Sequence, residues 1–207
     1  MLESDKEQIN KALKNKPSDQ VKKIICFIDD ALAFNKKHNI FVRSSPGEVL
    51  EKDILDCLPL IEKINKKEKI LDLGSGGGFP GILLAILKPE CEIHLLEKSQ
   101  KKCYFLNKTK DSLNLMNMKV LKTTIQKNSP IGEYSLITAR AFSSAKNILE
   151  ISEKNLMKEG RYLLLKGKID KINEELESIN TNKYKCEIIK TENEKYERHL
   201  VEIKINE

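Results

Sequence analysis

The chain has 207 residues, 40% of them hydrophobic and 33% charged, which is typical of one soluble domain with a short extension. No apolar stretch reaches the roughly 18 residues of a membrane span, and the polar N-terminus does not resemble a signal peptide. Five widely spaced cysteines without a CxxC pair predict reduced thiols and exclude an obvious zinc site. We therefore expect a cytoplasmic protein that needs neither a metal nor a membrane.

Positive charge is concentrated in one segment. The formal net charge is +6, and residues 98–127 hold eight lysines against the single carboxylate of Asp111. A local basic surface is typical of a nucleic-acid ligand, although a solvated lysine-rich helix gives the same pattern. The lysines that we expect to bind RNA are Lys98, Lys101, Lys102, Lys108 and Lys110.

The first 66 residues predict helices only. Apolar residues at helical spacing predict segments over residues 6–16, 18–37 and 45 to about 64. Ser45 and Glu48 have the spacing of a capping box, with proline at the first helical position. Pro59 lies inside the third segment, where it either kinks the helix or ends it early.

From residue 68 onward, short apolar runs alternate with helical segments. The predicted strands cover residues 69–73, 91–97, 118–121, 134–139 and 161–166, and the predicted helices cover 80–88, 99–114, 143–157 and 169–178. Two further strands, 184–191 and 199–205, flank a polar segment over 192–197 and predict an antiparallel hairpin. This order predicts a Rossmann-like, doubly wound α/β sheet with an antiparallel edge. We accordingly expect a helical extension over residues 1–66, packed on an α/β domain over residues 67–207.

A glycine-rich loop follows the first predicted strand. Residues 70–81 read ILDLGSGGGFPG, with Gly74, Gly76 and Gly78 among the glycines. In the first strand–helix turn of a doubly wound sheet, such a loop binds nucleotides. Residues 76–81 formally match the GxGxxG pattern of NAD(P) sites, but Asp72, just before the glycines, would repel a pyrophosphate. A carboxylate there suits the sulfonium and ammonium groups of S-adenosylmethionine, and Glu97, at the end of the second strand, suits the ribose hydroxyls of either ligand.

The reaction type follows in part from motifs that are missing. No Asn/Asp-Pro-Pro-aromatic motif for methylation of an exocyclic amine occurs, and no cysteine has the setting of a pyrimidine C-methylation nucleophile. Methylation of guanine N7 requires positioning and no strong base, because that nitrogen already presents a lone pair. Arg140 directly follows one predicted strand and Lys166 ends another, both at the ligand-binding edge, which makes them candidates for a catalytic role.

Several motifs together resemble those of one bacterial family. They are the glycine loop, Leu96-Glu97-Lys98-Ser99 with Lys101 and Lys102, Arg140-Ala141-Phe142, and Leu165-Lys166-Gly167. Their order and spacing over residues 20–170 are similar to those of the 16S rRNA guanine-N7 methyltransferases called RsmG, formerly GidB.

The resemblance implies a seven-stranded class I methyltransferase that uses S-adenosylmethionine and acts on 16S rRNA or the small ribosomal subunit. We expect the protein to be a monomer. By motif match, it places methyl-donor contacts on Gly74, Phe79, Ile125, Gln126 and Arg140. Two alternatives remain open at this point. They are an NAD(P)-dependent oxidoreductase on the same sheet and a non-catalytic rRNA-binding or assembly factor.

Overall fold

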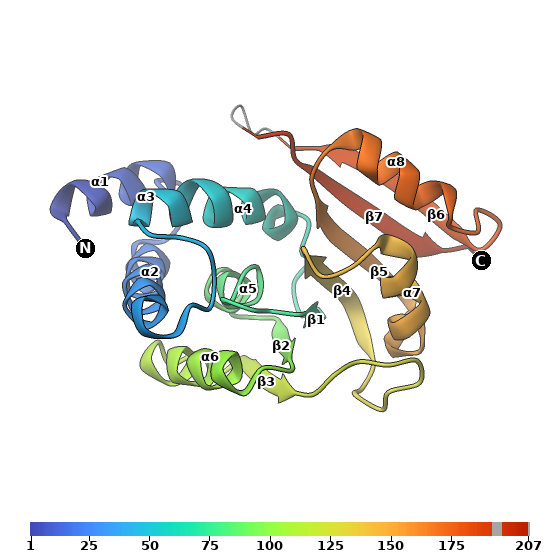
Figure 1. Cartoon of the computed structure of the whole chain (residues 1–207), viewed down its shortest axis with the longest axis horizontal. Coiled ribbons are helices and arrows are strands. Elements are labelled where there is room, and N and C mark those ends of the chain that lie inside the picture. Colours follow the sequence, from blue (N-terminus) through green and yellow to red (C-terminus); the bar gives the residue numbers. More distant parts are fainter. Residues whose placement is uncertain (192–195, 207) are drawn as a thin grey trace.

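A computed structural model describes residues 1–191 and 196–206. Its seven-stranded sheet has the order β3-β2-β1-β4-β5-β7-β6 (Figure 1). The strands are β1 (Lys69–Leu73), β2 (Glu92–Glu97), β3 (Met118–Lys122), β4 (Tyr134–Arg140), β5 (Leu156–Lys166), β6 (Tyr184–Lys190) and β7 (His199–Ile205). β1 to β5 are parallel, whereas β7 runs antiparallel to both β5 and β6. The doubly wound sheet with an antiparallel edge is therefore confirmed.

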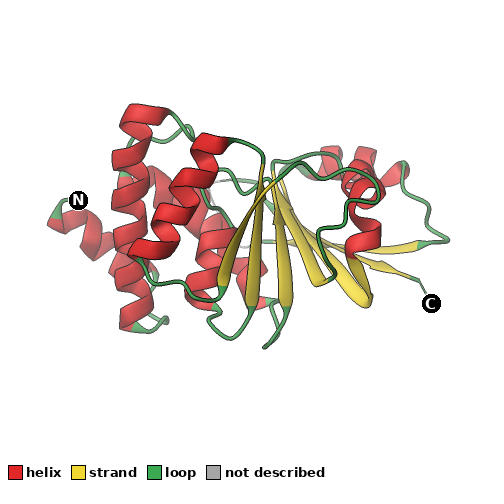
Figure 2. Ribbon diagram, turned by 90° about the horizontal axis from the view of Figure 1, so that it is seen from below, coloured by secondary structure: helices red, strands yellow, loops and turns green. Residues whose placement is uncertain are grey.

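Helices cover both faces of this sheet. The first face carries α1 (Glu3–Ala12), α2 (Ser18–His38), α3 (Pro46–Val49), the π-helical turn η1 (Leu50–Ile54), α4 (Leu55–Glu62), α5 (Gly81–Leu87) and α6 (Gln100–Ser112). The second face carries α7 (Ala145–Ser152), the 3₁₀ turn η2 (Glu153–Asn155) and α8 (Ile169–Glu177). Figure 2 shows the resulting three layers, with the sheet between two groups of helices. Within the described residues, no helix is both long and apolar enough to cross a bilayer.

The N-terminal helices and the sheet share one apolar core. Phe27 of α2 is fully buried, and its ring centroid lies 5.0 Å from that of Phe79 and 6.4 Å from that of Phe105 in α6. Burial of such rings removes about 150–250 Å² each from water and so fixes α2 firmly against the glycine loop and α6. The division into residues 1–66 and 67–207 stays a prediction. Residues of the first part do pack against residues of the second in this core.

The third N-terminal helix runs as far as Glu62, so Pro59 does not end it. It contains the π turn η1, where the N–H of Leu55 donates to the carbonyl of Leu50. At its start, the Ser45 hydroxyl accepts from the Glu48 N–H, as expected of a cap. The Glu48 carboxylate, however, accepts from Ser44, so only half of the predicted capping box forms.

Two predicted helices have wrong bounds. The first, expected over residues 6–16, spans Glu3–Ala12. The helix expected over residues 143–157 ends at Ser152, and β5 begins at Leu156, five residues before the expected strand. The Asn155 amide donates to the carbonyls of Ser129 and Gly132, at 3.0 and 2.9 Å, which anchors the chain in an extended path. These contacts join distant segments, and they override the local helical pattern. Residues 192–195 of the predicted hairpin turn lie outside the described residues.

Candidate functional site

The glycine loop joins β1 to α5 and contains two kinds of glycine. Gly74, Gly76 and Gly78 have φ values of +70°, +55° and +96°, which L side chains adopt rarely. A Cβ added to Gly76 would meet only the Gly74 carbonyl oxygen, at 3.6 Å. A Cβ on Gly81 would instead lie 2.6 Å from Asp72 Oδ2 and 2.7 Å from Leu95 Cγ. Gly81 is thus required for packing, whereas Gly76 faces open space that a ligand can fill.

Asp72 lies beneath this loop and is fully buried. Its Oδ2 accepts from the Gly81 N–H at 3.1 Å, and Oδ1 has no hydrogen-bond partner among the described residues. Burial raises the pKa of Asp72 to about 6, because desolvation outweighs the hydrogen bonds and the positive charge of Arg140. The sequence placed this carboxylate correctly before the glycines, but it lies below the loop and not at an open rim.

Glu97 ends β2 beside the same loop. Its Oε2 accepts from the Gly76 N–H at 3.0 Å, and its Oε1 accepts from the Ser99 N–H at 2.8 Å. The Ser99 hydroxyl in turn caps α6 by accepting a hydrogen bond from the backbone N–H of Lys102. The carboxylate therefore ties the open side of the glycine loop to the start of α6, close to where a nucleoside in that space would lie.

Two phenylalanines border the loop. Phe79 is buried between Phe27 and the guanidinium carbon of Arg140, which lies 5.5 Å from the centre of its ring. Phe142 follows β4 and is 37% exposed. Its ring lies against Gly74, so closely that a Cβ there would be 2.4 Å from Phe142 Cδ2. Phe79 supports the loop from inside, and Phe142 covers Gly74 from outside.

The two predicted residues after β3 have different environments. Ile125 is 5% exposed and packs in the core on the second face of the sheet. Gln126 is exposed, and its backbone N–H donates to the Ser129 hydroxyl at 2.8 Å. The Gln126 side chain is thus available to a ligand, whereas Ile125 can offer an apolar contact or its backbone.

Arg140 lies in a chain of ion pairs. Its guanidinium reaches Asp53 Oδ1 at 2.6 Å and Asp56 Oδ2 at 3.5 Å, and it donates to the Lys52 carbonyl at 3.1 Å. Asp53 also pairs with Arg43 at 2.8 Å, and Asp56 with Arg198 at 3.1 Å. Burial raises the pKa of Asp56, although Arg198 and Arg140 act to lower it.

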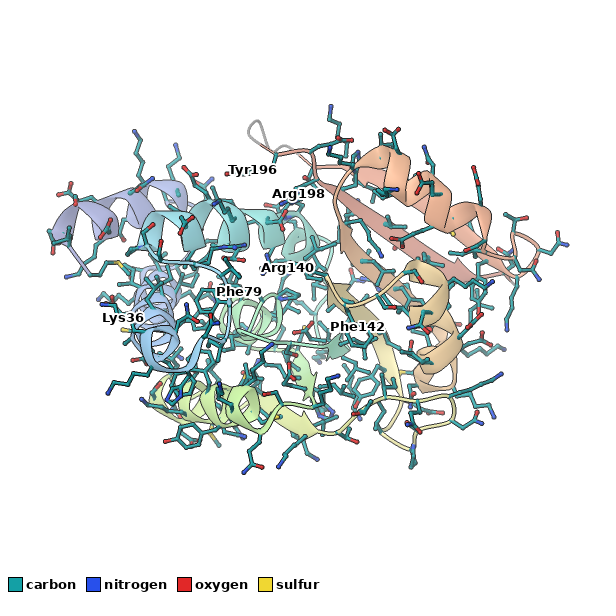
Figure 3. All side chains as sticks on the ribbon, in the orientation of Figure 1. Lys36, Phe79, Arg140, Phe142, Tyr196 and Arg198 are labelled. Atoms are coloured by element: carbon teal, nitrogen blue, oxygen red, sulfur yellow. The ribbon has the colours of Figure 1, made fainter. Side chains whose placement is uncertain are left out.

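A pocket of about 530 Å³ opens beside this chain of charges, at the carboxyl ends of β4 and β5. Arg43, Arg140 and Arg198 line it, so three of the four arginines in the chain gather here. Figure 3 shows Arg140 and Phe142 on the sheet side and Arg198 approaching from the β7 end. Lys166 also lines the pocket, donating to the Ser143 carbonyl at 2.9 Å and to Glu175 at 2.7 Å.

Comparison with known proteins identifies the family. The model of the GidB family, described as rRNA small subunit methyltransferase G, matches residues 20–201. The ribosomal RNA small subunit methyltransferase G of Brachyspira hyodysenteriae is 37% identical over 181 residues, covering 86% of this chain and 88% of that protein. Its namesake from Borrelia garinii subsp. bavariensis is 39% identical over 174 residues, covering 81% and 82%. The chain belongs to the GidB family.

The fold agrees with that assignment. The tRNA (m1A58) methyltransferase TrmI from Aquifex aeolicus superposes with a TM-score of 0.60 at 19% identity, over 74% of this chain and 69% of that one. The predicted class I methyltransferase fold is confirmed, and so is the resemblance to RsmG/GidB. The chain is accordingly an enzyme of the rRNA small subunit methyltransferase family.

Sequence reasoning missed most residues of the arginine pocket. Arg43, Asp53, Asp56 and Arg198 come from segments up to about 150 positions apart, and no local motif marks them. One indication was present, because only four of the 37 basic residues are arginine. Three of the four gather in this pocket, each paired with Asp53 or Asp56, whose carboxylates suit the planar guanidinium group.

The predicted RNA-binding lysines lie on a different side of the glycine loop. Lys98 precedes α6, and the other four lie on this helix, which is below the loop in Figure 1, whereas Arg198 lies above it in Figure 3. Lys98, Lys101 and Lys108 are exposed, and Lys101 donates to the His38 carbonyl at 2.9 Å. The structure thus does not bring the lysines to the arginine pocket, and the glycine loop lies between the two basic regions.

Proposed function

We propose that this GidB-family enzyme transfers a methyl group from S-adenosylmethionine to N7 of a guanine in small-subunit (16S) rRNA. One observation carries the donor side of the proposal. The backbone at Gly76 faces open space beside the Glu97 carboxylate, above a buried acid that can stabilise a cation.

The residues around that space fit a sulfonium nucleoside. Asp72 has an unpartnered buried oxygen within the described residues, and a nearby positive charge would favour its ionised form. Glu97 lies where it can accept ribose hydroxyls, and the backbone at Gly76, which faces open space, permits close approach. Gly74 and Gly78 hold the loop in its positive-φ path, with Phe142 and Ile82 packed where a side chain would lie. A pyrophosphate would meet both carboxylates instead, so the NAD(P) alternative is disfavoured on charge.

The other donor contacts expected from the family stay proposals. Gln126 is exposed and can hydrogen-bond to an adenine, while Ile125 can pack against it. Phe79 and Arg140 stack on each other behind the loop, with the Arg140 guanidinium already paired to Asp53. We infer that these two residues shape the donor site through the loop that they support.

The chemistry asks mainly for positioning. S-adenosylmethionine supplies an electrophilic methyl group, and the N7 lone pair forms the C–N bond as the C–S bond breaks. No proton has to be removed first, so an arginine pocket can serve by orienting the RNA. Holding both reactants in line can supply roughly 7–11 kcal/mol of the barrier. Arg140 and Lys166, the two candidates for a catalytic role, then act by position and charge.

The lysines on and before α6 supply a second contact surface for RNA. Exposed lysines bind phosphates without sequence preference, and each neutralised phosphate releases counterions. We propose that Lys98, Lys101, Lys102, Lys108 and Lys110 hold the backbone of the rRNA while the enzyme acts as a monomer.

Transfer of tritium from labelled S-adenosylmethionine to small-subunit rRNA tests the function. We expect the label in N7-methylguanine, located by borohydride and aniline cleavage, and we expect that site to be unmethylated in cells that lack the gene. Binding of NAD(P)H without donor binding would support the oxidoreductase instead. RNA binding without donor binding would support the non-catalytic factor.

A further inference from the structure

The arginine pocket contains an ion pair that joins Lys166, a candidate for a catalytic role, to a glutamate that has no role so far in the proposed methyl transfer. Lys166 ends β5, and Glu175 lies on α8; both line the pocket, and their side chains are 14% and 27% exposed. The two side chains form an ion pair at 2.7 Å. This pair lies at one wall of a pocket that is otherwise rich in cations.

The hydrogen-bonding capacity of this pair is incompletely used. Lys166 Nζ has three protons and donates two of them, to the Ser143 carbonyl and to Glu175 Oε2. Glu175 Oε2 accepts from Lys166 and from the Ala145 N–H at 2.7 Å. Within residues 1–191 and 196–206, no hydrogen bond occupies Glu175 Oε1 or the third Lys166 proton. One donor and one acceptor therefore remain next to each other at the pocket wall.

A neighbouring donor and acceptor distinguish guanine from adenine. Guanine presents the O6 acceptor next to the N1–H donor, whereas adenine presents an N6 amino donor next to the N1 acceptor. We propose that Lys166 donates to O6 and Glu175 accepts from N1–H of the target guanine, so that this pair selects the base. The inference rests on the proposed function and adds the residues that choose its acceptor.

The rest of the pocket suits a nucleotide taken out of its stack. Phe142 lines the pocket and contacts Gly74 of the donor loop, so a base stacked on this ring lies next to the donor space. O6 lies between N1 and N7 on the purine, so a base held by O6 and N1–H keeps N7 unobstructed for attack. Enzymes that modify bases commonly extrude them into such pockets.

Further cations of the pocket suit the phosphates on either side of the base. Arg43, Lys52 and Arg198 line it together with the Lys166–Glu175 pair. Arg198 also lies over the Tyr196 ring, with its guanidinium carbon 5.5 Å from the ring centre. Guanidinium groups bind phosphate bidentately, which would fix the register of the RNA while the pair identifies the base.

Titration with mononucleotides tests the pair directly. The wild-type protein, saturated with S-adenosylhomocysteine, is titrated with guanosine, inosine and adenosine 5′-monophosphates and followed by NMR shifts. Inosine keeps O6 and N1–H but lacks the 2-amino group. We expect guanosine and inosine monophosphates to bind at least about tenfold more tightly than adenosine monophosphate, because the wrong donor–acceptor order leaves these partly buried groups unpaired.

Three variants separate base selection from structure. Glu175→Gln and Lys166→Met should each reduce the guanosine preference to less than about threefold, with the affinity for S-adenosylhomocysteine unchanged. Glu174→Gln is the matched control, because Glu174 is the neighbouring residue on α8 and pairs with Lys171 in solvent. It should keep the wild-type preference.

The outcomes distinguish this inference from the proposed function. Equal binding of the three nucleotides by the wild type, no binding of any, or an unchanged preference in both site variants would overturn the assignment of the pair. If the wild type fails to methylate small-subunit rRNA, the proposed function itself falls. Wild-type methylation together with an unchanged rRNA KM in Glu175→Gln would leave the function standing and remove Glu175 from base selection.

Discussion

Asp72 should make both stability and donor binding depend on pH in a narrow range. Its pKa is raised from 3.8 to about 6 by burial, so the folded protein holds this proton where the unfolded chain has lost it. Stability rises with pH only where the unfolded state binds more protons, and here the folded state binds more. The contribution of Asp72 to the free energy of unfolding therefore falls as pH rises from about 4 to 6.

The size of the effect follows from the shift in pKa. In this range, each unit of rising pH lowers the contribution of Asp72 to the free energy of unfolding by about 1.4 kcal/mol. The whole shift in pKa amounts to about 3 kcal/mol. Asp72→Asn keeps an oxygen for the Gly81 N–H and removes the titration. The substitution removes the cost of burying a charged carboxylate. The new amide group finds no partner at the Oδ1 position, however, and this lowers the free energy of unfolding by about 1–3 kcal/mol. The slope with pH is consequently a cleaner measure than the stability at one pH.

The assay is urea unfolding of the wild type and Asp72→Asn at half-unit steps from pH 4.5 to 7. We expect the wild type to lose up to about 1.4 kcal/mol per pH unit relative to the variant below pH 6, and the difference to level off above it. Donor affinity should change in the opposite direction. S-adenosylmethionine should bind the wild type more weakly as pH falls through about 6, because the buried carboxylate beneath the proposed donor space becomes neutral. Parallel stability curves for the two proteins would refute this account of Asp72.

Three further outcomes test other parts of the site. Gly76→Asp should lower donor affinity at least about 100-fold, or about 2.7 kcal/mol, while Tm falls by less than about 5 °C. Gly81→Ala should instead lower Tm, because its Cβ would lie against Asp72. Donor affinity is measured by calorimetric titration, and full affinity in Gly76→Asp would mean that the donor binds elsewhere. Neutralising three lysines on α6 should reduce the slope of log K against log salt for rRNA binding by about 2–3, while three exposed lysines elsewhere should leave it unchanged. The test set is Lys101, Lys102 and Lys108, and the control set is Lys158, Lys171 and Lys185. Asp53→Ala should lower the free energy of unfolding by about 3–5 kcal/mol, measured in urea, because it leaves two guanidiniums without their buried partner.

Local patterns predicted most of the elements because buried parallel strands have a simple signature. The sequence predicted two strands almost to the residue, because apolar runs closed by turn residues leave few alternatives. They are Lys69–Leu73, which precedes the glycines, and Met118–Lys122. Asp72 was placed correctly before the loop for the same reason. Its depth was not predictable, because the hydrogen bond to Gly81 depends on how α5 packs back on β1.

Contacts between distant segments account for what the sequence did not reveal. The Arg140–Asp53 pair joins residues 87 positions apart, and composition contains nothing that specifies such a pairing. Asn155 illustrates the same limit in the fold, because its amide bonds to two carbonyls more than 20 residues away and ends a pattern that looked helical. Two features of the sequence pointed toward the pocket: the strand-end positions of Arg140 and Lys166, and the rarity of arginine in this chain.

The N-terminal helices complete the candidate site as well as covering the sheet. Asp53 and Asp56 lie three residues apart on neighbouring turns of one helix, so both carboxylates reach the arginine at the end of β4. Phe41 covers the opposite side of the donor loop, where a Cβ on Gly77 would lie 3.2 Å from its ring. The loop that carries Phe41 is itself held to α2 by the Asn35 side chain, which accepts from the Ile40 and Phe41 N–H groups. Without residues 1–66, Arg140 would lose both carboxylates and Gly77 its cover, so the donor loop and the arginine pocket both depend on this extension.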